Sequence, residues 1–339
     1  MRAAIIDTPG CIRVGSVPDP SPGPDELLIR VGACGICGTD LHILAGDSPV
    51  ARYPIIPGHE FAGEVVALGS NVALDNDLNL TVGSRVAIEP NLTCGQCEMC
   101  RTGHENLCLH YRAIGVTLSG AMAEYVTVPI AKAYALPDNL TLREAALIEP
   151  VSCAVRGMHS LNPRSGDTFL IAGAGTMGLL LLQLALKGGA SRVAVVDVNT
   201  RRLARAENLG ASRTYTSIQQ ALADEPSGFN CVIDATGVAP VIEQAFTAVK
   251  RSGKLLIFGV AADEARISLS PFRIYNEEIT IVGSMAVLAS FQPALDLICG
   301  GVIDTQSMLT AALPLEDFTR ALDLVKRGEG VKTQILPGL

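Results

Sequence analysis

Tryptophan is absent from this 339-residue sequence, and aromatic residues make up only 4% of it. This scarcity argues against a binding pocket lined with aromatic rings. Basic residues are also in the minority, since 26 Lys and Arg face 34 Asp and Glu and the net charge is −8. A nucleic-acid-binding surface is therefore not expected.

An uninterrupted long apolar run is also missing. The most apolar stretch, residues 169–186, is broken by Gly173, Gly175 and Gly178, so it does not predict a membrane span. Residues 1–10 lack the basic, apolar and small-residue order of a secretory signal peptide. We therefore expect a cytoplasmic protein without a membrane partner. In that compartment its ten cysteines would be metal ligands or reduced thiols rather than disulfides.

Hydrophobic residues make up 48% of the chain, and its length suggests two domains. Residues 1–150 predict short strands between turns, which is typical of an all-β core or small barrel. From residue 151 strands alternate with helices, which predicts a parallel sheet covered on both faces and ending near residue 288. The expected strands are 3–6, 26–31, 63–68, 85–88, 123–128, 168–172, 192–196, 230–233, 254–260, 279–283 and 332–335; the expected helices are 141–160, 177–187, 201–209, 241–249, 291–299 and 316–326.

Four cysteines lie close together in the first region, at Cys94, Cys97, Cys100 and Cys108. Four thiolates at this spacing can hold one zinc ion tetrahedrally, and such a site has no open position for chemistry. An iron–sulfur cluster is the alternative, because bacterial ferredoxins begin with the same C-x2-C-x2-C spacing. In those proteins the fourth cysteine follows after three residues and precedes proline, whereas here the gap is seven residues and Leu109 follows.

A second group of candidate ligands is scattered: Cys37, His59, and either Glu60 or Glu149. A catalytic zinc takes about three protein ligands of mixed type and keeps one position open. Each signal is weak alone. A histidine after glycine is often structural, and Cys34 with Cys37 also matches a redox C-x-x-C motif, although no βαβ unit begins there.

A glycine-rich turn follows the strand expected at 168–172 and opens the next helix. Its glycines permit a tight turn and a close approach of the backbone to a pyrophosphate, which the helix N-terminus attracts. A purely structural turn is the alternative. The residues of this candidate dinucleotide site are Gly173, Gly175, Thr176, Met177 and Gly178.

Asp197 stands 19 residues after Gly178, at the end of the next expected strand. A carboxylate there accepts hydrogen bonds from ribose hydroxyls and repels a 2′-phosphate, which favours NAD over NADP. Arg201 and Arg202 either face a phosphate or begin the next helix as solvated charges. The presence of Asp197 favours the solvated interpretation, and Arg202 stays a candidate cofactor contact.

These motifs together resemble the zinc-dependent medium-chain dehydrogenase family, and the resemblance runs through nearly the whole chain. It is carried by residues 37–42, by residues 58–66, by the four-cysteine segment and by the glycine-rich turn. The resemblance implies an α/β protein with a GroES-like β-rich catalytic domain at 1–150 and 288–339. It also implies a Rossmann NAD-binding domain, a doubly wound parallel sheet, at 151–287, with the catalytic zinc in the cleft between the domains.

The resemblance also implies roles for single residues. Cys37 and His59 match the first two zinc ligands of the family. Glu60 and Glu149 match two glutamates that share or exchange zinc coordination in sorbitol, xylitol, arabinitol and threonine dehydrogenases. Which of them binds the resting zinc is left open.

Two further residues match the proton path of the family. Thr39 matches the hydroxyl that takes the substrate proton, and His42 matches the histidine at the far end of the relay. Without the family, His42 would be interpreted as a surface residue of a helix.

The implied activity is transfer of a hydride from a secondary hydroxyl of a polyol or sugar alcohol to NAD, giving the ketose, in a homotetramer or homodimer with a catalytic and a structural zinc. A threonine-type amino-alcohol or phosphorylated-polyol dehydrogenase is the enzymatic alternative. The non-enzymatic alternative is a structural or regulatory protein that binds zinc and nucleotide. The presence of all four candidate ligands, Cys37, His59, Glu60 and Glu149, argues against this alternative. Arg273 and Tyr275 bind substrate hydroxyls or have a structural or interface role.

Overall fold

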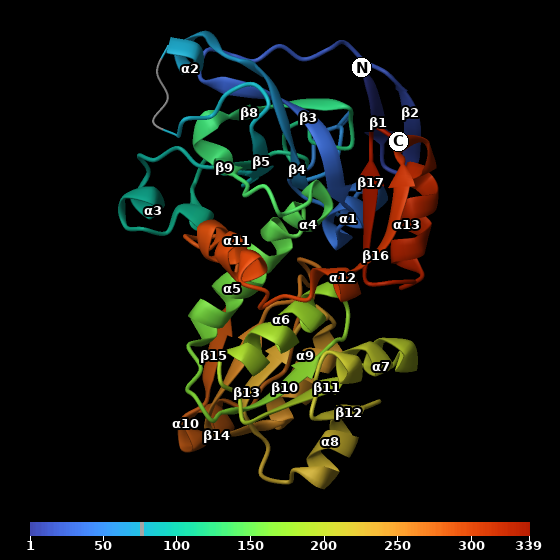
Figure 1. Ribbon diagram of the computed structural model, residues 1–339. Helices are drawn as coiled ribbons and strands as arrows, with labels where there is room; N and C mark the ends of the chain where they lie inside the picture. Colours follow the sequence, from blue (N-terminus) through green and yellow to red (C-terminus); the bar gives the residue numbers. More distant parts are fainter. Residues whose placement is uncertain (75–77) are drawn as a thin grey trace. The chain divides into compact units, whose positions relative to one another are not determined.

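A computed structural model describes residues 1–74 and 78–339. It divides the chain into two compact units (Figure 1): unit 1 comprises residues 1–152, 287–299 and 304–339, and unit 2 comprises residues 153–286 and 300–303. No helix in the described part of the chain is both long and apolar enough to cross a lipid bilayer.

Unit 1 is built on a largely antiparallel sheet whose central strand is β3. Strand β3 pairs with β4, β8 and β17, so strands from both ends of the chain meet on it (Figure 1). The buried side chains of this unit form one cluster that includes Leu27, Ile29, Phe61 and Phe318. The strands of the main sheet are β3 (Glu26–Gly35), β4 (Glu60–Leu68), β5 (Arg85–Ile88), β8 (Tyr125–Pro129), β9 (Ala133–Ala135), β16 (Leu309–Pro314) and β17 (Lys332–Leu336). Two small antiparallel pairs complete the strands: β1 (Arg2–Thr8) with β2 (Cys11–Ser16), and β6 (Asn91–Leu92) with β7 (Arg112–Ala113).

The helices of unit 1 are short, and α1 and α4 begin with capping boxes. Helix α1 has Cys37 as its N-cap, with the Asp40 carboxylate accepting from the Cys37 N–H. Its C-cap is Gly46, in the left-handed region with φ 85°. Helix α4 begins with the reciprocal pair Thr141 and Glu144. The helical segments are α1 (Gly38–Ala45), α2 (Ser70–Leu74), α3 (Glu98–Arg101), η1 (Glu105–Leu107), η2 (Ile130–Lys132), α4 (Leu142–Ala145), α11 (Phe291–Cys299), α12 (Thr305–Met308), η3 (Leu315–Asp317) and α13 (Phe318–Lys326).

Unit 2 contains a six-stranded parallel sheet in the order β12-β11-β10-β13-β14-β15. Numbered within the unit, this is the order 3-2-1-4-5-6 of the Rossmann fold. Its strands β10, β11 and β13 carry almost continuous apolar runs, as expected of strands covered on both faces. The strands are β10 (Thr168–Ala172), β11 (Arg192–Val196), β12 (Arg213–Tyr215), β13 (Phe229–Asp234), β14 (Val249–Ile257) and β15 (Thr280–Gly283); the helices are α6 (Thr176–Lys187), α7 (Thr200–Asn208), α8 (Ile218–Asp224), α9 (Ala239–Thr247) and α10 (Pro271–Glu277). The predicted fold class, a GroES-like domain with a Rossmann domain, is confirmed.

The prediction of a single helix at 141–160 is wrong. The structure has two helices there, α4 and then α5 (Ile148–Leu161), separated by Ala146 and Leu147. Pro150 explains the break, because its ring would clash with the carbonyl of residue 146 in a continuous helix, whereas proline is tolerated in the first turn of a new one. The break places Glu149 in the first turn of α5.

A second error lies between residues 241 and 260. The sequence predicts a helix to residue 249 and a strand from residue 254, but α9 ends at Thr247 and β14 already begins at Val249. The exposed residues Lys250, Arg251 and Ser252 form an irregular start of the strand: Ser252 has φ 58°, and the register with β13 shifts here. They have no apolar alternation, so periodicity does not reveal this part of the strand.

Candidate metal centres and nucleotide-binding turn

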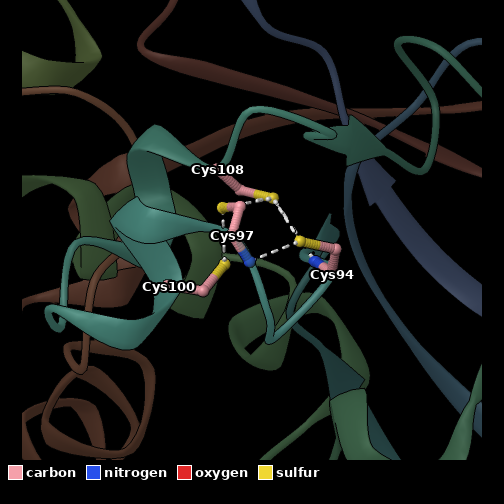
Figure 2. Close-up of side chains that lie close together, drawn as sticks. All are labelled: Cys94, Cys97, Cys100 and Cys108. Atoms are coloured by element: carbon pink, nitrogen blue, oxygen red, sulfur yellow. Dashed lines mark hydrogen bonds between the residues drawn. The ribbon is translucent and has the colours of Figure 1, made fainter.

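The four cysteines at 94–108 converge in one lobe (Figure 2). The Sγ atom of Cys97 lies 3.5 Å from that of Cys100 and 3.9 Å from that of Cys108, and Cys108 Sγ lies 3.6 Å from Cys94 Sγ. Zinc–sulfur bonds of about 2.3 Å in a tetrahedron put the sulfurs about 3.8 Å apart. The spacing therefore fits four ligands around one metal ion, and none of the four forms a disulfide.

Backbone N–H groups surround these sulfurs. The N–H of Cys97 donates to Cys94 Sγ, and the N–H groups of Cys94 and His110 donate to Cys108 Sγ, each at 3.3 Å. Hydrogen bonds from backbone N–H groups lower the pKa of Cys97 to about 6, whereas burial and neighbouring thiols raise the pKa of Cys100 to about 12. The lobe thus stabilises thiolates, but the sulfurs need a shared cation before all four can lose their protons.

The second cluster forms where β3 and β4 pair. Cys37 follows the end of β3, and His59 and Glu60 stand at the start of β4, where Gly35 pairs with Glu60. The ligand atoms of Cys37, His59 and Glu60 all lie within 4.8 Å of one another. His59 is 7% exposed and Glu60 is 1% exposed, whereas Cys37 is half-buried, so the cluster is buried on the side of His59 and Glu60.

Gly58 fixes the backbone that carries His59. Its φ is +98°, and a Cβ atom there would lie 2.7 Å from Cys34 Sγ and 2.8 Å from Met122 Cγ. The Gly58 carbonyl accepts a hydrogen bond from the N–H of Ala121 at 2.9 Å. Only glycine fits this position, and the tight packing leaves the His59 backbone little freedom.

Asp40 also belongs to this site, which its sequence context alone does not indicate. Its carboxylate is fully buried and accepts from the Cys37 N–H at 2.9 Å, while Oδ1 lies 3.9 Å from His59 Nδ1. Neither His59 Nδ1 nor Asp40 Oδ1 has a hydrogen-bond partner within the described residues. A carboxylate behind an imidazole is the usual support of a metal-binding histidine, and it leaves Nε2 for the metal. The capping-box spacing of Cys37 and Asp40 was the available signal.

Lys332 is a second residue that the sequence did not reveal. It forms a buried ion pair with Glu60, and its Nζ also donates to the carbonyl of Ile36 at 3.0 Å. Burial lowers the pKa of Lys332, but the negative groups of Glu60, Cys37 and Glu149 outweigh it and raise that pKa above its usual value. The lysine is therefore charged. It reaches the site because β17 pairs with β3.

Glu149 lies close enough to act electrostatically on His59 and Lys332, but it is not among the ligand atoms that lie within 4.8 Å of one another. It is 8% exposed. Burial lowers the pKa of His59, yet Cys37, Asp40 and Glu149 together raise it well above its usual value. The site therefore attracts positive charge.

Thr39 and His42 occupy one face of helix α1. The Sγ of Cys37 lies 3.7 Å from Thr39 Oγ1, which places this hydroxyl next to the ligand cluster. The His42 side chain is 50% exposed, and its Nδ1 lies 4.0 Å from Asp47 Oδ2. Residues three apart share a helix face, so Thr39, next to the cluster, and the half-exposed His42 lie on the same side of α1.

In unit 2 the glycine-rich turn leaves β10 and opens α6. Gly173 has φ +103°, and a Cβ on Gly178 would collide with the Gly173 carbonyl. Asp197, just after β11, accepts from the N–H of Ala174 and from that of Asn199, both at 2.8 Å. Arg202 Nη1 lies 3.8 Å from Asp197 Oδ2. The turn therefore has the backbone of a dinucleotide-binding site, with a carboxylate at the end of the second strand.

Arg273 is engaged within unit 2 itself. Its guanidinium pairs with Glu277 at 2.9 Å, donates to the carbonyls of Phe246 and Val249, and lies over the Phe246 ring. This arrangement supports the structural interpretation of Arg273. Tyr275 is 82% exposed.

Two family models match the chain: the alcohol dehydrogenase GroES-like domain over residues 23–138, and the zinc-binding dehydrogenase domain over residues 176–299. The chain is 37% identical to D-arabinitol dehydrogenase 1 of Uromyces fabae, with 92% of this chain and 90% of that protein covered. It belongs to the zinc-dependent medium-chain alcohol dehydrogenases, in their polyol branch.

Other dehydrogenases are similar to this chain over most of its length. D-altritol 5-dehydrogenase of Agrobacterium fabrum is 39% identical, with 81% of each chain covered, and an L-threonine 3-dehydrogenase of Coxiella burnetii is 31% identical, with 92% of each covered. A zinc-binding dehydrogenase from Sinorhizobium meliloti, solved with NADP, has TM-score 0.92 and 33% identity over 99% of each chain. A protein described as a short chain alcohol dehydrogenase, from E. coli CFT073 and solved with NADH, has TM-score 0.91 and 26% identity over 99% of each chain.

For this zinc-dependent dehydrogenase, we expect Cys97→Ser to lower the melting temperature by about 10 °C, or roughly 3–5 kcal/mol, because a structural zinc contributes directly to folding. Calorimetry and the zinc content of the purified protein measure the effect. Cys299→Ser, at an exposed cysteine outside both clusters, is the matched control and should melt like the parent protein. Unchanged melting of Cys97→Ser would count against a metal in the lobe.

Proposed function

We propose that this chain is an NAD-linked polyol dehydrogenase. In the reaction, a secondary alcohol loses a proton from oxygen and a hydride from carbon, which gives a ketose, NADH and H⁺. The observation that carries the proposal is the cluster of half-buried Cys37 with buried His59 and Glu60, in a chain that also has a glycine-rich turn between a strand and a helix. The names of the D-arabinitol and D-altritol dehydrogenases support the substrate class.

The residues of the cluster fit a catalytic zinc. Thiolate, imidazole and carboxylate are ligands that zinc prefers, and the buried Nδ1 of His59 without a hydrogen-bond partner faces the Asp40 carboxylate. We infer that Cys37, His59 and Glu60 hold the ion, with Glu149 near enough to replace Glu60. When bound, zinc supplies Lewis-acid polarisation of the hydroxyl oxygen.

The chain's own residues would then move the proton. The Thr39 hydroxyl, beside the cluster, is placed to accept the proton of the substrate hydroxyl. His42, three residues later on the same helix face and half exposed, is placed to pass it to solvent. The four-cysteine lobe would hold a second, structural zinc, so that each chain binds two.

We propose NAD as the cofactor, since the Asp197 carboxylate is held at the position where it would accept ribose hydroxyls and repel a 2′-phosphate. Arg202 lies beside this carboxylate, which compensates the positive charge of its guanidinium. The turn residues that would contact the dinucleotide are Gly173, Gly175, Thr176, Met177 and Gly178.

Self-association as a homodimer or homotetramer is also proposed. Strand β15 is an edge strand of its sheet, and the flanking side chains Phe272 and Tyr275 are 71% and 82% exposed. Light scattering during size-exclusion chromatography tests this proposal, and a mass near the 35.5 kDa of one chain would contradict it.

The decisive test is a substrate panel that follows formation of the reduced nucleotide. D-arabinitol, D-altritol and sorbitol are compared with L-threonine and a phosphorylated pentitol, each with NAD and with NADP. We expect oxidation of the free polyols with NAD. Oxidation of threonine alone, or of the phosphorylated polyol alone, would select the alternative enzyme, and no oxidation of any alcohol by zinc-loaded protein would refute the proposal.

A further inference from the structure

A cavity of about 410 Å³ lies beside the four-cysteine lobe in unit 1. Its size is that of sites for whole small molecules rather than single ions. Strands β6 and β7 contribute to its lining through the cross-strand pair Leu92 and Arg112. Arg52 also lines it and comes from the segment between α1 and β4, so two segments that are distant in the sequence meet at this cavity.

The lining of this cavity is basic, although the chain as a whole has a net charge of −8. Arg52, His110 and Arg112 all line it, and all three are exposed to solvent. Within residues 1–74 and 78–339, none of these three side chains has a hydrogen-bond or ion-pair partner, and no Asp or Glu lines the cavity. Two unpaired guanidinium groups at one cavity repel each other, and an anion between them removes that repulsion.

Neutral groups around the cavity add hydrogen-bonding capacity. Thr93 contributes a hydroxyl, and Tyr111 lines the cavity while its own hydroxyl donates to Asn91 Oδ1. Asn91 is 4% exposed, and its Nδ2 has no hydrogen-bond partner in the part of the chain that the structure describes. Buried amide groups without a partner are few in folded proteins. A spare donor is therefore present next to Tyr111.

Phosphate is the anion that this donor set fits best. The planar fork of an arginine can bind two phosphate oxygens at once, and imidazole and hydroxyl groups can donate to the others. A phosphate monoester carries nearly two negative charges at pH 7, which match two guanidinium groups. We propose that the cavity binds a small phosphorylated polyol or sugar through its phosphate group. The inference goes beyond the proposed function, because it does not require a zinc ion at Cys37.

A phosphate held by both arginines joins two parts of unit 1. Arg52 belongs to the segment between α1, which carries Thr39 and His42, and β4, which begins with Glu60. Arg112 belongs to β7, next to the four-cysteine lobe. The ligand binds a site that only the folded chain provides, so it should raise the melting temperature in proportion to the logarithm of its concentration.

The test is a calorimetric titration of the holoenzyme, saturated with NADH so that the dinucleotide turn is already occupied. D-arabinitol 5-phosphate, inorganic phosphate and D-arabinitol are titrated separately in phosphate-free buffer. We expect saturable binding of both phosphates, and at least about ten-fold tighter binding of the phosphorylated polyol, because it fills more of the cavity. Equal affinities of the two phosphates would overturn the assignment to a polyol or sugar and would indicate a site for free phosphate.

Substitutions at the two arginines assign the binding to this cavity. Arg52→Gln and Arg112→Gln should each weaken the binding of D-arabinitol 5-phosphate about ten-fold, the scale of one charge-assisted hydrogen bond. The binding of D-arabinitol, which has no anionic group, should not change. The matched control is Arg101→Gln, which removes an exposed arginine of α3 in the same lobe but outside the cavity and should bind like the parent protein.

A competing explanation is that the arginines only balance the negative charge of the thiolates, since Cys94 also lines the cavity (Figure 2). In that case the parent protein would bind neither phosphate, and Arg52→Gln combined with Arg112→Gln would lose zinc from the lobe. Zinc content is therefore measured on the same samples. Absence of saturable phosphate binding, or equal binding by the parent and the double variant, overturns the proposed phosphate site.

Discussion

Cys37→Ser and His59→Ala are each expected to reduce alcohol oxidation by at least about 1,000-fold, equivalent to roughly 4 kcal/mol of transition-state stabilisation. Each change removes one of three clustered ligands and with it the means to polarise the substrate hydroxyl. Oxidation is followed by the absorbance of the reduced nucleotide, and zinc content is measured on the same samples.

The same variants should still bind NADH with nearly the parent affinity. The residues of the dinucleotide turn and Asp197 belong to unit 2, whereas Cys37 and His59 belong to unit 1. The fluorescence of bound NADH measures this affinity. Cys11→Ser makes the same chemical change at an exposed cysteine of β2 and should retain full activity. Full activity in Cys37→Ser would refute the zinc assignment.

Asp197→Ser is expected to lower the preference for NAD over NADP, measured as the ratio of kcat/KM, by at least about 100-fold, or roughly 2.7 kcal/mol. The substitution removes the charge that repels a 2′-phosphate. In the parent protein Arg202 Nη1 lies 3.8 Å from the Asp197 carboxylate. Without that carboxylate, Arg202 could pair with the 2′-phosphate of NADP. The ratio of kcat/KM for the two cofactors is measured with one polyol.

The contribution of Arg202 can be separated from that of Asp197. Adding Arg202→Ala to Asp197→Ser should remove the gain with NADP while the loss with NAD stays. An unchanged cofactor ratio in Asp197→Ser would show that the carboxylate supports the turn through Ala174 and Asn199 without reading the ribose.

The sequence predicted those features that depend on short-range spacing. The four cysteines lie within one segment, and the glycine turn lies between an apolar strand and an apolar helix, so both could be recognised from the order of residues alone. The pairing of Cys37 with His59 was suggested by family resemblance, and the structure brings these residues together with Glu60. Their role as zinc ligands stays a prediction.

Long-range pairing explains what the sequence did not reveal. Lys332 meets Glu60 only because β17 and β4 both pair with β3, and nothing in the residues around 332 indicates this. Asp40 was visible in the motif, but its contact with His59 depends on the same strand pairing. The break between α4 and α5 could have been anticipated from Pro150, whereas the polar start of β14 has no periodic pattern to detect.

The two candidate metal centres differ in the length of chain needed to build them. Cys94 and Cys108 are 14 positions apart, so the lobe can close locally soon after this segment leaves the ribosome. The other centre gathers residues from both ends of the chain: Lys332, whose Nζ donates to the Ile36 carbonyl, lies 296 positions after Ile36, and all of unit 2 is synthesised between them. A chain that lacks β17 would therefore have a closed four-cysteine lobe but no Lys332 to compensate the buried Glu60 carboxylate. The surroundings of the second centre are completed only at the end of synthesis.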